Sequence, residues 1–132
     1  MTTDQSSARS PAARHTGLLL VLAGVLVLHL AALYWPRVDV TGPVQQSDKV
    51  VHALLFATPV IVASCVVHSW RWLALLLAVH APVSEVVQHY VLPHRSGDPL
   101  DAVADLVGVA LGATVAWWWV SRRSWSQVGE SD

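Results

Sequence analysis

The sequence predicts an all-α integral membrane protein, an antiparallel bundle of four transmembrane helices. Hydrophobic residues make up 54% of its 132 residues and charged residues only 13%, about half of the roughly 25% that soluble domains carry. Four apolar segments are each close to the roughly 20 residues that cross a hydrocarbon core of about 30 Å. Short connections join the segments, so consecutive helices are expected to run in opposite directions.

The four predicted helices cover residues 17–35, 50–68, 72–92 and 101–120. The first ends in the interfacial pair Tyr34-Trp35, which suits a retained membrane anchor. A cleaved signal peptide is the alternative, but this run is longer than the roughly 7 to 15 apolar residues of such peptides. Residues 1–16 and 121–132 are expected to form tails, the first of them disordered.

The connections contain typical turn residues. Residues 69–71 form a tight turn, and residues 93–100 include Pro93, Gly97 and Pro99. The flanking basic residues set the expected orientation. With the N-terminus inside, five of them are cytoplasmic and three lie outside: Arg9, Arg14, Arg71, Arg122 and Arg123, against Arg37, Lys49 and Arg95. This distribution favours a multi-pass protein with both termini in the cytoplasm.

Polar and ionisable side chains gather at the predicted outer end of the helices. Such groups are costly in hydrocarbon, so they define a candidate functional site. The candidate ligand-binding residues are Asp48, Lys49, His52, Glu85, Gln88, Arg95, Asp98, Asp101 and Asp105. The lipid bilayer is the expected partner. A nucleic-acid partner is disfavoured, because the formal net charge is -1 and no basic face is present.

Glu85 is the most informative of these residues. It lies about 10 Å below the outer end of its segment, too deep for its carboxylate simply to reach water. We therefore expect it to pair with Lys49, Arg95 or His52, to bind a cation, or to remain protonated.

Two glycines continue the helical stripe that carries Asp101 and Asp105. Gly108 and Gly112 form a small-xxx-small pattern, which allows close helix packing. We expect them to bring the fourth helix against the helix that bears Glu85. The same pattern would serve a homo-oligomer equally well.

The cluster contains groups suited to catalysis or to metal binding. Carboxylates with one imidazole suit a divalent cation such as Mg²⁺, Mn²⁺ or Zn²⁺, although the chain lacks HExxH and CxxC motifs. An ion-pair network that only holds the helices together is the alternative. The candidate catalytic residues are Glu85, Asp101, Asp105 and His52. His29, His68 and His80 have no acidic partner at helical spacing and are interpreted as packing or interface residues.

Three motifs occur in order along the chain. They are DKVVHALLF at 48–56, EVVQ at 85–88, and RSGDPLD at 95–101 ahead of a helix with two glycines. Together they resemble the VanZ-like membrane protein family, although Asp105 stands where that family usually has Asn. The resemblance implies a small protein of the bacterial cytoplasmic membrane, in a family named for a member associated with low-level teicoplanin resistance.

Two functions from different classes remain open. An outward-facing pocket would bind a cell-envelope lipid or an amphiphilic antibiotic, with Lys49 and Arg95 contacting an acidic headgroup. Alternatively, a membrane-embedded and metal-assisted enzyme would act on an envelope lipid or sugar intermediate. A proton-coupled transporter is a third hypothesis, disfavoured because four helices in one protomer make a small pathway.

Overall fold

The computed structural model describes residues 10–35, 47–92 and 97–128, and all regular secondary structure in these ranges is α-helical. The helices are α1 (Pro11–Tyr34), α2 (Ser47–Val66), α3 (Trp70–Tyr90) and α4 (Pro99–Val128). All four are long and apolar enough to cross a membrane. The prediction of an all-α chain with four candidate membrane-spanning helices is therefore confirmed, and it indicates a multi-pass membrane protein.

Helix α1 begins at Pro11, earlier than the expected residue 17. The hydroxyl of Ser10 accepts a hydrogen bond of 3.2 Å from the backbone N–H of Ala13, and Pro11 occupies the first helical position. A serine cap followed by proline is a strong helix start. Residues 11–16, which we expected in the disordered tail, are therefore helical.

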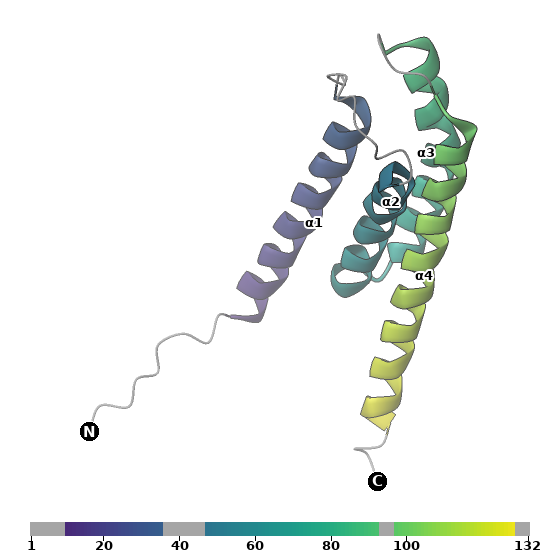
Figure 1. The fold of residues 1–132 in the computed structure, drawn as a ribbon. Coiled ribbons are helices and arrows are strands. Elements are labelled where there is room, and N and C mark those ends of the chain that lie inside the picture. Colours follow the sequence, from purple (N-terminus) through teal and green to yellow (C-terminus); the bar gives the residue numbers. More distant parts are fainter. Residues whose placement is uncertain (1–9, 36–46, 93–96, 129–132) are drawn as a thin grey trace.

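Helix α4 is also longer than expected. The Asp98 carboxylate accepts a hydrogen bond of 2.9 Å from the Leu100 N–H, and this cap starts the helix at Pro99 instead of residue 101. The helix continues to Val128, past the predicted end at residue 120. Near that end the Arg122 guanidinium lies 4.0 Å from the centre of the Trp118 ring. With 30 residues, or about 45 Å, α4 extends beyond its neighbours (Figure 1). Helices α2 and α3 lie within three residues of their predicted limits.

Helix α2 contacts all three other helices and packs most extensively against α4. Helix α1 lies beside α2 and contacts it more extensively than α3 does (Figure 1). The C-terminal ends of α1 and α3 and the N-terminal ends of α2 and α4 lie at the upper end of Figure 1. We call this end of the molecule the polar end, because it holds the candidate site residues.

The two glycines of α4 face α2, which corrects our expectation that they face the helix bearing Glu85. A Cβ atom at Gly108 would collide with the backbone carbonyl of Ala53, and one at Gly112 would lie 2.7 Å from the carbonyl oxygen of Ala57. Only glycine allows such a close approach of two backbones. The small-xxx-small pattern therefore sets the α2–α4 contact and aligns the polar N-terminal ends of these helices.

Apolar side chains fill the interior and also cover much of the outside. Leu33, Phe56, Val60 and Ala116 are fully buried in the core. Many large apolar side chains on all four helices are exposed, Leu20 on α1 and Trp72 on α3 among them. Soluble monomers rarely expose so much contiguous apolar surface. The charged groups of the polar end are thus set on helices with apolar outer faces.

Candidate functional site

The structure brings most of the predicted site residues together at the polar end. Helix α2 supplies Asp48, Lys49 and His52, α3 supplies Glu85 and Gln88, and α4 with its cap supplies Asp98, Asp101 and Asp105. Arg95 lies outside the described residues. These residues share a location because the polar residues of α2 and α4 lie at the N-terminal ends of these helices and those of α3 lie toward its C-terminal end.

Lys49 links the start of α2 to the start of α4. Its Nζ donates hydrogen bonds of 3.1 Å to Oδ2 of Asp98 and 2.9 Å to Oδ1 of Asp101. The Lys49 side chain remains 37% exposed. The Leu100 N–H, and then the Lys49 ammonium, hold the pKa of Asp98 below its usual range. This side chain therefore caps α4 and accepts from Lys49 as a carboxylate.

His52 and Asp105 form the most buried polar pair of the site. Nδ1 of His52 lies 2.9 Å from Oδ1 of Asp105, and the two residues are 3% and 0% exposed. The other carboxylate oxygen of Asp105, Oδ2, is buried and has no hydrogen-bond partner among the described residues. Buried polar atoms are rarely left unsatisfied, so this oxygen is a candidate contact for a ligand.

Glu85 has a partner that the sequence did not reveal. Its Oε2 accepts a hydrogen bond of 2.9 Å from the backbone N–H of Asp98, and Gln88 lies 3.4 Å from its Oε1. Gly97 packs directly on the backbone carbonyl of Glu85, where any side chain would collide. The connection to α4 therefore folds onto α3 and supplies the donor. Neither Lys49 nor His52 forms an ion pair with Glu85 in the described structure.

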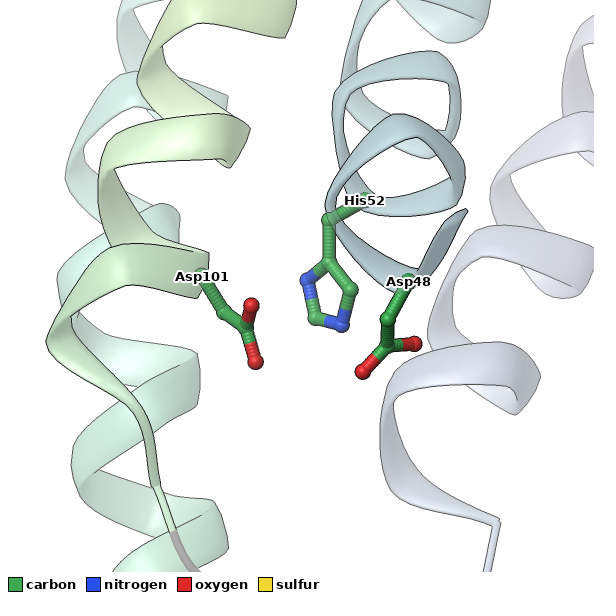
Figure 2. Close-up of side chains that lie close together, drawn as sticks. All are labelled: Asp48, His52 and Asp101. Carbon is green, nitrogen blue, oxygen red and sulfur yellow. The ribbon is translucent and has the colours of Figure 1, made fainter. Parts of the chain in front are cut away.

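Two overlapping groups of three side chains have ligand atoms within 4.8 Å of one another. The first is Asp48, His52 and Asp101, and the second is His52, Glu85 and Asp105. Figure 2 shows the first group, in which the His52 ring lies between the carboxyl groups of Asp48 on α2 and Asp101 on α4. Both groups combine an imidazole with two carboxylates, which is a donor set for a divalent cation.

A chain of polar groups beside the site was missed by the sequence analysis. The Tyr34 hydroxyl lies 2.8 Å from Nε2 of His80, and Nδ1 of His80 lies 3.4 Å from Nε2 of His29. Nδ1 of His29 lies 3.0 Å from the carbonyl oxygen of Leu55. The partners belong to different helices, so spacing within one helix could not reveal them. The available signal was the presence of two histidines in apolar segments.

The direction of this chain follows from its fixed end. The Leu55 carbonyl can only accept, so Nδ1 of His29 carries the proton and, in a neutral ring, Nε2 accepts. Nδ1 of His80 must then donate to His29. Its Nε2 accepts from the Tyr34 hydroxyl. Three buried or half-buried side chains thereby satisfy one another without a charged partner.

The site holds more acid than base. The described residues of the polar end include five carboxyl groups and one lysine: Asp48, Glu85, Asp98, Asp101 and Asp105, with Lys49. Because two of the carboxylates already hold Lys49, the site favours a cationic or amine-bearing ligand over an anion. Lys49, which we expected to contact an acidic headgroup together with Arg95, is held by Asp98 and Asp101.

Comparison with known proteins adds no further constraint. No protein-family model, curated protein or solved structure matches the chain significantly.

Proposed function

We propose that this chain is a VanZ-like protein of the bacterial cytoplasmic membrane that binds the amine-bearing headgroup of a cell-envelope lipid or amphiphilic antibiotic. Its four helices cross the bilayer as an antiparallel bundle, with both termini in the cytoplasm and the polar end facing outward. The apolar outer faces of the helices support insertion. The order of the three sequence motifs supports the family.

One observation carries the headgroup proposal. Among the residues that the structure describes, five carboxyl groups and one lysine lie at the same end of otherwise apolar helices. A primary ammonium group can donate three hydrogen bonds to such oxygens. Asp48 and Asp101, which flank His52 in Figure 2, would hold it alongside Lys49, which donates to Oδ1 of Asp101. The acyl chains of the bound lipid would lie along the apolar outer faces of the helices.

A direct binding experiment tests this proposal. The full chain in detergent is mixed with phosphatidylethanolamine, phosphatidylcholine or phosphatidylglycerol and examined by native mass spectrometry. We expect retention of phosphatidylethanolamine, because phosphatidylcholine lacks an N–H donor and phosphatidylglycerol lacks an amine. Asp48→Asn combined with Asp101→Asn should remove this preference. Arg71→Gln, a charge change at the start of α3, is the control and should retain it. Equal retention of the three lipids by the wild type would contradict the proposal.

The physiological part of the proposal is tested by teicoplanin susceptibility. A bacterial host without a related protein expresses the wild type, the Asp48→Asn/Asp101→Asn variant or Arg71→Gln at matched membrane levels. We expect protection by the wild type and Arg71→Gln only. If none of the three protects, the association with resistance does not extend to this chain.

A membrane-embedded enzyme is the second candidate function. The buried His52–Asp105 pair favours it, because a carboxylate that holds one imidazole nitrogen prepares the other as a general base. The substrate class would be an envelope lipid or sugar intermediate. Incubation of the reconstituted protein with radiolabelled envelope lipid extract tests for turnover. Glu85→Gln should abolish turnover but retain headgroup binding.

A further inference from the structure

Three ligating side chains meet in the interior just below the surface of the polar end. His52 comes from α2, Glu85 from α3 and Asp105 from α4, and all three are buried. Their ligand atoms lie within 4.8 Å of one another. Gly108, one turn after Asp105, brings α4 against α2, and Gly97 brings the start of α4 against α3. The helix packing itself thus assembles the three side chains.

The Asp105 carboxylate provides independent evidence for a ligand. The residue is fully buried, and only its Oδ1 is hydrogen-bonded, to His52. Oδ2 lacks a partner in the described part of the chain. A buried carboxylate oxygen without a donor is unfavourable, and a bound cation would satisfy it.

The formal charges of the triad match a divalent ion. Glu85 and Asp105 contribute two negative charges, and His52 is a neutral donor when it binds a metal. Within the described ranges, neither carboxylate forms an ion pair with lysine or arginine, because Lys49 is held by Asp98 and Asp101. An ion of charge +2 would leave this buried group electrically neutral.

The ligand types narrow the choice of ion. Imidazole suits first-row transition metals, whereas Ca²⁺ and Mg²⁺ prefer oxygen ligands alone. The other interactions of Glu85 resemble the outer shell of a metal site, because the Asp98 N–H and Gln88 orient its carboxylate. Three protein ligands also leave coordination positions open for water or a substrate.

We propose that His52, Glu85 and Asp105 bind one Mn²⁺ or Zn²⁺ ion between α2, α3 and α4. Asp105 is the ligand on which the charge balance depends, because an amide at this position could not supply the second negative charge. The site does not depend on headgroup binding. In the second candidate function this metal, and not His52, would supply the activation of water, because an imidazole that ligates a metal is not a general base.

Metal titration of the purified full chain tests the proposal. The protein in detergent is stripped with a chelator, and MnCl₂ or ZnCl₂ is then added in a calorimeter. We expect one equivalent to bind. Loss of an outer-shell partner alone weakens metal affinity about 10- to 100-fold, so Asp105→Asn should weaken it by about 100-fold or more. Arg71→Gln is the control, because it also changes one charge but lies 14 residues, or about 21 Å, from Glu85 along α3, and it should bind as the wild type does.

A second measurement identifies the ligands. Electron spin-echo spectra of the Mn²⁺ protein should show a ¹⁴N coupling that disappears in His52→Gln. Glu85→Gln should also weaken metal binding, and it replaces Asp105→Asn in the titration if that variant fails to fold. Circular dichroism and gel filtration establish that each variant is folded. The proposal is wrong if the wild type binds less than half an equivalent of Mn²⁺ and also less than half an equivalent of Zn²⁺. It is also wrong if folded Asp105→Asn and Glu85→Gln both bind metal as tightly as the wild type. Because no lipid is added, failure here leaves the headgroup proposal intact.

Discussion

Nδ1 of His52 on α2 and Oδ1 of Asp105 on α4 lie 2.9 Å apart, in a part of the interior from which water is almost excluded. This contact joins the two helices that pack most extensively against each other. It lies one turn from Gly108, where the backbones of α2 and α4 are in close contact. The stability of the helix pair and the chemistry of the candidate site therefore depend on the same few residues.

The first prediction concerns this pair. His52→Ala should lower the free energy of unfolding by about 3 to 5 kcal/mol, because it leaves the buried Asp105 charge without a partner. Asp105→Asn should restore part of the loss when it is added to His52→Ala. Unfolding in increasing dodecyl sulfate measures both values. A loss below about 1.7 kcal/mol, the upper range for neutral hydrogen bonds between membrane helices, would show that Asp105 is not a buried charge that depends on His52.

The second prediction concerns the glycine contact. Gly108→Ala should destabilise the protein by about 1 to 3 kcal/mol, because its Cβ would displace the backbone of Ala53. Gly24→Ala on α1 is the matched control. Nothing lies within 4 Å of its added Cβ, so the better helix propensity of alanine should stabilise the protein by up to about 1 kcal/mol. Thermal unfolding in detergent compares the two, and equal effects would argue against the α2–α4 contact.

The third prediction concerns the histidine chain. We expect ¹⁵N spectra of histidine-labelled protein to show His29 and His80 as neutral rings protonated at Nδ1. The Tyr34 hydroxyl donates to Nε2 of His80, so Tyr34→Phe should change the ¹⁵N shift of His80 Nε2 more than the shifts of the other ring nitrogens of His29 and His80. Its cost should be only about 0.6 kcal/mol, the average for hydrogen bonds between membrane helices. A proton on Nε2 of His80 in the wild type would reverse the inferred direction of the chain.

The fourth prediction concerns pH. The pKa of Asp98 is lowered in the folded protein, so its contribution to stability is present above the unfolded pKa and is lost as pH falls through the folded pKa. We expect the melting temperature to fall below about pH 4, the usual range of an unfolded aspartate. Asp98→Asn should reduce this dependence. Lys49→Gln should reduce it less, because the capping Leu100 N–H remains.

The sequence correctly indicated the helices and the end at which the described polar side chains gather. Hydrophobic length is a local property, so four apolar runs predicted four candidate spans. Helical spacing placed Asp101, Asp105 and Gly108 on one stripe, and all three face α2 in the structure. The start of α1 was misplaced although Ser10-Pro11 is a recognisable cap, because the apolar run was taken as the whole helix.

The partners across helices were decided by tertiary structure. Spacing identifies which residues share a face of one helix, but it does not identify the neighbour that this face meets. For this reason the glycines were assigned to the wrong neighbour, the chain from Tyr34 to His29 was missed, and the Asp98 N–H was not foreseen as a donor to Glu85. The sequence by itself determined that costly polar groups lie at one end of an apolar chain. Only the packing of the helices, set by backbone contacts at Gly97 and Gly108, decided which of those groups are close enough to share a proton or an ion.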